Sequence, residues 1–225
     1  MKSITCLLSA IIIFLSIQSA RAEKITEYLQ YADEKVTLDI YNPGGSNRPV
    51  AILIHGAAGI SGDRAERYRN FATDLMKNGI IAVNVHYFDS KRDNWVNTIR
   101  QTINHVQQIP NANSNRIGLI GYSLGGTLAL QVASIDNRVK LLATGSGYLP
   151  LGFTKEHALR LPKILMISGD QDSAINTLNT ISQWLIESGK PFEVKIDRGL
   201  GHDNIPMNVF QEDWDAIVRF FVRNL

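Results

Sequence analysis

The chain has 225 residues, of which 44% are hydrophobic, a single cysteine and a formal net charge of +2 at pH 7. So small a charge argues against the strongly basic surface of a nucleic-acid-binding protein, and one cysteine excludes a disulfide framework. The length suffices for one sizeable core, so we expect a single domain over residues 23–225 and no nucleic-acid partner.

Residues 1–22 have the pattern of a secretory signal peptide. Lys2 precedes an apolar run centred on residues 11–17, and Ala20-Arg21-Ala22 forms a small-x-small cleavage site. The apolar run is shorter than the roughly 20 residues that a membrane span needs. The alternative to a cleaved signal peptide is an uncleaved N-terminal anchor. We therefore expect a secreted or periplasmic protein with no stable membrane insertion after cleavage of the signal.

Removal of the signal peptide changes the charge and the cysteine content. Lys2 and Arg21 are two of the 23 basic residues, so the 21 that remain balance the 21 acidic residues. Cys6 is removed as well, which leaves the mature chain without cysteine. The stability of the exported protein must therefore come from its hydrophobic core rather than from disulfides.

Strand and helix patterns alternate along the rest of the chain. Strands are expected at 25–31 and 36–41, joined by a hairpin turn at 32–35, and at 50–54, 80–85, 116–122, 139–144, 163–168 and 192–196. Helices are expected at 68–76, 96–106, 124–132, 178–185 and 210–221. The alternation predicts an α/β fold, a mostly parallel sheet of about eight strands with helices on both faces. Residues 145–162 have no clear pattern and are too few for a cap domain.

Ser123 lies where a strand pattern gives way directly to a helix pattern. Gly121 and Gly125 flank it in the G-x-S-x-G arrangement of a nucleophile elbow. The sharp turn strains the serine backbone, and side chains at the two flanking positions would collide with the strand and the helix. The sequence therefore predicts an exposed nucleophilic hydroxyl at Ser123.

A serine hydroxyl needs a base to remove its proton, and the base needs a carboxylate to orient it. After Ser123 the chain supplies an acid and then a histidine, in loops that follow predicted strands. His202 is the expected general base and later general acid. Asp172 is the expected carboxylate, and Asp170 is the alternative.

An oxyanion hole needs two converging N–H donors. Leu124 follows the nucleophile and supplies one, and the loop after strand 50–54 should supply the other. In that loop Ala57 is the first choice and Ala58 the second, because small side chains let the backbone approach a substrate. Candidates for the substrate pocket are Ala58, Tyr87, Phe88 and Tyr148, with padding of the sheet as the alternative for the aromatic residues.

The stretch Gly121-Tyr122-Ser123-Leu124-Gly125-Gly126 resembles the elbow of the dienelactone hydrolase family, whose type members carry Gly-Tyr-Cys-Leu-Gly-Gly. The resemblance extends over essentially the whole mature chain, including Asp172, the His202 loop and Tyr87 after the fourth strand. It implies the α/β-hydrolase fold without a cap domain and a nucleophile–histidine–acid triad.

Two departures from that family pattern stand out. The nucleophile is serine rather than cysteine, and the loop His55-Gly56-Ala57-Ala58 lacks the glutamate that helps to activate the thiol in the cysteine members. The family's lactone hydrolases hold the substrate carboxylate with two arginines, one shortly after the tyrosine and one shortly after the catalytic histidine. Here these positions hold Phe88-Asp89 and residues 204–207, none of which is arginine. Lys91 or Arg92 are the nearest basic residues that could replace them. The resemblance therefore covers fold and triad but not substrate.

The other histidines are not expected to react. His55 and His86 precede the acid in the chain and should be structural or line the pocket, while His105 and His157 should face solvent. No histidine pair has metal-site spacing and no cysteine cluster exists, so we expect no metal and no cofactor.

These features together predict an exported serine hydrolase that cleaves carboxylic ester bonds of a small molecule through an acyl-enzyme intermediate. The alternatives are a thioesterase or peptidase-type acyl hydrolase of the same fold, or a non-catalytic binding protein built on it. The sequence carries no prediction of the oligomeric state.

Overall fold

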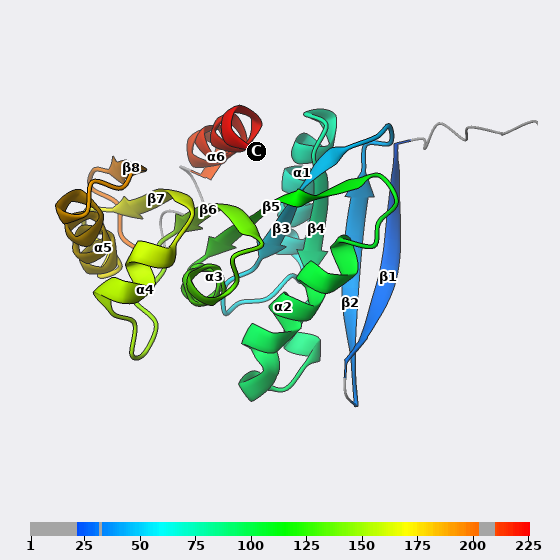
Figure 1. Cartoon of the computed structure of the whole chain (residues 1–225), viewed down its shortest axis with the longest axis horizontal. Coiled ribbons are helices and arrows are strands. Elements are labelled where there is room, and N and C mark those ends of the chain that lie inside the picture. The colour runs from blue at the N-terminus through cyan, green and yellow to red at the C-terminus, as the bar shows by residue number, and fades with distance from the viewer. Residues whose placement is uncertain (1–21, 32, 203–209) are drawn as a thin grey trace, which may run out of the picture.

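A computed structural model describes residues 22–31, 33–202 and 210–225 (Figure 1). Residues 1–21 of the predicted signal peptide, Ala32 of the predicted hairpin turn, and residues 203–209 lie outside the described residues. No helix of the described part is long and apolar enough to cross a membrane.

Eight strands form one sheet in the order β1-β2-β4-β3-β5-β6-β7-β8. Their bounds are β1 (Glu23–Tyr31), β2 (Glu34–Asn42), β3 (Arg48–Ile54), β4 (Ile81–Val85), β5 (Ala112–Tyr122), β6 (Val139–Gly145), β7 (Lys163–Gly169) and β8 (Phe192–Asp197). The β1–β2 and β2–β4 pairs are antiparallel and the other pairs are parallel. The predicted mostly parallel α/β architecture is therefore confirmed.

The register brings the carboxyl ends of five parallel strands to one edge of the sheet. Ile54 of β3 pairs with Gly121 of β5, and Tyr122 pairs with Gly145 of β6. Gly169, the last residue of β7, pairs with Asp197 of β8. The loops that follow these strands carry all the residues that the sequence singled out for chemistry, and ligand sites in such sheets gather at this edge.

Helices cover both faces of the sheet (Figure 1). On one face α1 (Asp63–Lys77) and α6 (Phe210–Asn224) share a hydrophobic cluster with the strands. On the other face lie α2 (Trp95–Val106), α3 (Leu124–Ile135), α4 (Lys155–Arg160) and α5 (Ile175–Glu187). Two short 3-10 turns, η1 (Tyr87–Asp89) and η2 (Arg92–Asn94), lead from β4 into α2.

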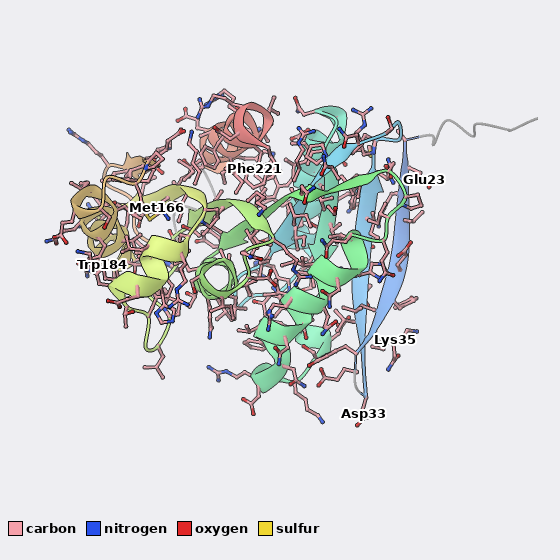
Figure 2. The ribbon with its side chains drawn as sticks, viewed as in Figure 1. Glu23, Asp33, Lys35, Met166, Trp184 and Phe221 are labelled. Carbon is pink, nitrogen blue, oxygen red and sulfur yellow. The ribbon has the colours of Figure 1, made fainter. Side chains whose placement is uncertain are left out.

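Aromatic rings dominate the core between α6 and the sheet. Phe221, labelled in Figure 2, is fully buried, and a Cβ at Gly118 of β5 would lie 2.6 Å from its ring. Trp214 of α6 packs against Phe71 of α1 with ring centroids 4.2 Å apart. Each fully buried large side chain contributes about 1.5–3 kcal/mol, so these rings hold α6 and α1 on the same face as one layer.

The segment expected to lack regular structure contains α4. Thr154 precedes this helix, and its hydroxyl lies 3.0 Å from Nδ1 of His157 in the first turn. Six residues are too few for hydrophobic periodicity to reveal a helix, so capping and packing decide it here. Ala158 and Leu161 are buried, which fastens this turn to the core.

A buried ion cluster ties β8 to the first turn of α6. The Lys195 ammonium donates to both Asp197 and Asp213, and both carboxylates are shielded from solvent. Burial raises the pKa of Asp213 to about 6, and the nearby Asp197 carboxylate acts in the same direction against the opposing effect of Lys195. Asp213 therefore takes up a proton as the pH falls through about 6.

The raised pKa of Asp213 predicts a pH-dependent stability. The folded pKa of about 6 lies above the roughly 3.9 of an unfolded aspartate, so the folded state holds this proton more tightly. This contribution is complete below about pH 4 and is lost as the pH rises through 6. We expect the unfolding free energy of the wild type to fall by up to about 3 kcal/mol between pH 4 and 7 from this group. Asp213→Asn has no titrating group at this position, so its unfolding free energy should not show this fall.

Urea unfolding at several pH values across this range measures the difference. Asp215→Asn is the matched control, because Asp215 lies on the same helix and is exposed. Parallel stability curves for wild type and Asp213→Asn would contradict the prediction.

Candidate functional site

Ser123 occupies a strained turn between β5 and α3. Its φ of 52° and ψ of −119° lie outside the regions that side-chain-bearing residues favour, and its N–H donates to the carbonyl of Gly145 at 2.8 Å. A Cβ at Gly121 would lie 2.2 Å from the Gly125 carbonyl oxygen, and one at Gly125 would lie 2.0 Å from that of Ile54. Only glycine fits at both flanking positions, as the elbow pattern requires.

The structure brings Ser123, His202 and Asp172 into one hydrogen-bonded chain. Ser123 Oγ lies 2.9 Å from His202 Nε2, and His202 Nδ1 lies 2.9 Å from Asp172 Oδ2. The Asp172 side chain is 0% exposed and that of His202 is 30% exposed. The second carboxylate oxygen of Asp172 accepts the backbone N–H of Ala174 at 2.9 Å, so this buried acid has partners on both oxygens.

Asp170, the alternative acid, has a different partner. Its carboxylate accepts the backbone N–H of Gly199 at 2.7 Å, and its own N–H donates to the carbonyl of Asp197. Asp170 therefore shapes the loop that leaves β8, whereas Asp172 contacts the imidazole itself.

The loop after β3 passes directly beside the nucleophile. A Cβ at Gly56 would lie 3.3 Å from the Cβ of Ser123, which places the Ala57 backbone close to the serine. In the described part of the chain neither the Ala57 N–H nor the Leu124 N–H has a hydrogen-bond partner. Two free N–H groups next to a nucleophile are what an oxyanion hole requires.

His55 supports this loop from within the protein. Its ring stacks on that of Tyr87 with centroids 4.2 Å apart, and the Tyr87 hydroxyl donates to the His55 carbonyl at 2.7 Å. Burial lowers the pKa of His55 to about 4, so the imidazole stays neutral at physiological pH. Tyr87 is 0% exposed, which corrects its predicted place in the substrate pocket. Phe88 packs edge-on against His55 and also lies outside the cleft lining.

An open cleft of about 780 Å³ lies over the serine. It is lined by the β3 loop, the first turns of α1 and the reactive side chains: Gly56, Ala57, Ala58, Gly59, Ser61, Gly62, Asp63, Arg64, Arg67, Tyr68, Phe71, Tyr122, Ser123 and His202. Ala58 thus lies where the sequence predicted. The wall formed by α1 was missed, because Tyr68 and Phe71 fit the apolar stripe of an ordinary core helix. The sequence did hold one signal: α1 begins only a few residues after the β3 loop, which places its first turns next to the nucleophile.

Tyr148, predicted to line the pocket, lies against the histidine instead. Its ring centroid is 5.5 Å from that of His202, with an interplanar angle of 34°. Tyr122 also lies nearly parallel to the imidazole, and its hydroxyl donates to the His202 carbonyl at 3.0 Å. Tyr122 was not singled out from the sequence, although it occupies the variable position before the serine.

The remaining histidines make structural contacts. His86 lies 3.3 Å from the Asp39 carboxylate, and His105 lies 2.5 Å from Glu27, which joins α2 to β1. His105 was expected to face solvent, and its pairing with Glu27 corrects that expectation. Among the residues that the structure describes, no three histidine, cysteine or acidic side chains are grouped as metal ligands would be.

Comparison with known proteins adds to this geometry. The model of the dienelactone hydrolase family matches residues 39–204, which include the elbow, both aspartates and His202. The 5-methylorsellinic acid synthase of Aspergillus terreus is 26% identical over 114 residues. That match takes in 42% of this chain but only 4% of the synthase, so the chain spans a small part of this relative's length.

Solved structures share the fold at low sequence identity. One of two fungal esterases from Rhizomucor miehei superposes with a TM-score of 0.75 and 17% identity, over 91% of this chain and 84% of the esterase. A dienelactone hydrolase-like promiscuous phosphotriesterase from metagenomic libraries has a TM-score of 0.75 and 14% identity, over 91% of this chain and 99% of its own. At such identities the likeness establishes the fold alone.

Proposed function

Because the chain belongs to the dienelactone hydrolase family, we propose that it is an exported serine hydrolase that cleaves carboxylic ester bonds of small molecules. One observation carries the proposal: a strained, accessible serine hydroxyl lies 2.9 Å from His202, which lies 2.9 Å from buried Asp172. This is the geometry that converts a serine into a nucleophile.

In the first half of the reaction Ser123 Oγ bonds to the ester carbonyl carbon while His202 Nε2 takes the hydroxyl proton. The carbonyl oxygen becomes an oxyanion, and the N–H groups of Leu124 and Ala57 donate to it. Asp172 accepts the Nδ1 proton of His202 in a hydrogen bond, which fixes the imidazole tautomer and stabilises the positive charge that the ring gains.

In the second half the carbon–oxygen bond of the ester breaks, and His202 gives its proton to the leaving alcohol. An acyl group then remains on Ser123. A water molecule loses a proton to His202 Nε2 and attacks the acyl carbon, after which the acid leaves and Ser123 recovers its proton. The open cleft gives this water access to the acyl group.

A serine nucleophile also suits the surroundings of the β3 loop. The loop contains no carboxylate, and the neutral, buried His55 brings no charge to the reacting hydroxyl. His202, oriented by Asp172, is therefore the base that activates the hydroxyl.

The nucleophile is tested with Ser123→Ala. We expect kcat/KM on a short activated ester to fall by about 10³-fold or more, and labelling by a fluorophosphonate probe to disappear. Circular dichroism and thermal melting of the variant are the control for folding. Unchanged turnover in Ser123→Ala would contradict the mechanism.

The same wild-type protein separates the competing functions. A matched panel of esters, thioesters and amides shows which acyl bond is preferred, and preference for thioesters or amides would support the alternative hydrolases. A folded wild type that neither turns over the panel nor takes up the probe would favour a binding protein on this fold.

The choice of acid is tested by a matched pair of variants. Asp172→Asn removes the acceptor that orients His202, so kcat should fall by about 10²–10⁴-fold. Asp170→Asn changes a carboxylate that, within the described part of the chain, accepts a backbone N–H and does not contact His202, so kcat should change by less than about tenfold. The opposite ranking, measured on one ester at saturation, would assign the role to Asp170.

Export is tested at the N-terminus of the chain. Expressed with residues 1–22 in a bacterial host, the protein should be recovered outside the cytoplasm with Glu23 as its first residue, as intact mass measures. Ala22→Tyr, which places a bulky ring at the cleavage site, should keep the precursor uncleaved. A wild type that retains residues 1–22 in the membrane fraction would support the uncleaved anchor.

A further inference from the structure

Tyr148 makes contacts that the reaction scheme does not use. Its hydroxyl lies 3.5 Å from His202 Nδ1 and 3.2 Å from Ser173 Oγ, while its ring packs against the imidazole at a tilt of 34°. Ser173 immediately follows Asp172 in the chain. The loop after β7 therefore reaches His202 at two points, directly through the Asp172 carboxylate and indirectly through the hydroxyls of Ser173 and Tyr148.

The backbone of Tyr148 is fastened to the elbow. Its N–H donates to Thr127 Oγ1 at 2.9 Å, and Thr127 of α3 is bonded through its N–H to the Ser123 carbonyl at 3.0 Å. The next residue is held as well, because the Leu149 N–H donates to Thr177 Oγ1 at 2.9 Å. The backbone of Tyr148 is thus held in a fixed position relative to Ser123, even though the residue is 39% exposed.

The position of the hydroxyl distinguishes two possible roles. Bond making and breaking take place at His202 Nε2, next to Ser123, whereas Tyr148 contacts the Nδ1 end of the same ring. Tyr148 is also absent from the lining of the cleft over the serine. If Tyr148 lined the substrate cleft, it should contact that cleft, and its replacement should alter substrate binding. If it orients His202, its replacement should alter proton transfer.

Resting on the proposed function, we propose that Tyr148 is a positioning residue that, together with Ser173, holds His202 in the orientation that links Asp172 to Ser123. The tyrosine ring limits rotation of the imidazole and shields the Asp172–His202 hydrogen bond from water. The hydroxyl offers a second acceptor beside Nδ1–H, and the electron-rich ring face favours the positive charge that His202 gains. Both effects act on the rate of proton transfer and leave the cleft unchanged.

The experiment measures kcat and KM separately on one short neutral ester. Tyr148→Leu should lower kcat by about 10–100-fold with KM within about twofold of the wild type. Tyr148→Phe, which keeps the ring, should recover most of this loss and retain a deficit of about threefold. Tyr28→Leu is the matched control for removal of an exposed tyrosine, because Tyr28 lies on edge strand β1, and it should change neither constant.

A double-mutant cycle tests the hydroxyl pair. Ser173→Ala should cost about the same as Tyr148→Phe, and the double variant should cost no more than either, because both changes break one bridge. Additive losses would overturn the bridge.

Two other results would overturn the positioning role. A raised KM or altered acyl-chain preference in Tyr148→Leu at unchanged kcat would make Tyr148 a substrate wall. Wild-type constants in Tyr148→Leu would leave it without any role. The Ser123→Ala variant distinguishes failure of the proposed serine mechanism from failure of the proposed role of Tyr148. Unchanged turnover in Ser123→Ala would contradict the serine mechanism, whatever the results for the Tyr148 variants.

Discussion

The site depends on how closely the first turn of α3 approaches the end of β3. The Ile54 carbonyl lies where a Cβ at Gly125 would sit, with only 2.0 Å between the two atoms. No side chain fits into this backbone contact, and without it the serine could not stand beside the β3 loop. The same approach leaves the N–H groups of Leu124 and Ala57 near Ser123 without a hydrogen-bond partner among the residues that the structure describes. The strain at Ser123 is held by the surrounding sheet, which fixes both ends of the turn.

A second constraint is the burial of Asp172. A carboxylate removed from water is costly unless charges and hydrogen bonds compensate, and here the Ala174 N–H and the His202 ring supply them. The histidine is less buried than its acid, so its Nε2 end can meet both Ser123 and a substrate in the cleft. Asp170 lies two residues earlier and accepts the Gly199 N–H of the loop that carries His202. Asp172 therefore contacts the histidine ring, whereas Asp170 supports the loop before it.

The hydrogen-bonded residues Ser123, His202 and Asp172 have different surroundings at the serine end and at the Nδ1 side of the histidine. The cleft over Ser123 is open and walled by α1, with Arg64, Tyr68 and Phe71 among its lining residues. The Nδ1 side of His202 is instead covered by Tyr148, which is tied to the elbow through Thr127. In the proposed mechanism, substrate selection and histidine orientation therefore fall to different elements, and substitutions on α1 are expected to alter substrate preference without disturbing His202.

The sequence alone predicted the mostly parallel sheet, because long buried strands and amphipathic helices leave strong periodic patterns. It also singled out Ser123, Asp172 and His202, because sharp turns and strand-end loops restrict which residue types occur there. It left Asp170 open as the acid, since two carboxylates in one loop differ only in where their side chains point. The six-residue helix α4 lacked the length to show a period.

Only the tertiary structure decided what surrounds that chain of residues. Tyr87 and Tyr148 were both predicted to line the pocket, and packing placed one beneath His55 and the other against His202. Phe71 belongs to the core, as its place in the apolar stripe of α1 indicates, and it also lines the cleft together with the partly buried Tyr68. The physical reason is that local sequence patterns report backbone geometry and average burial. The neighbours of an aromatic side chain depend on contacts between segments far apart in the chain, which no local pattern records.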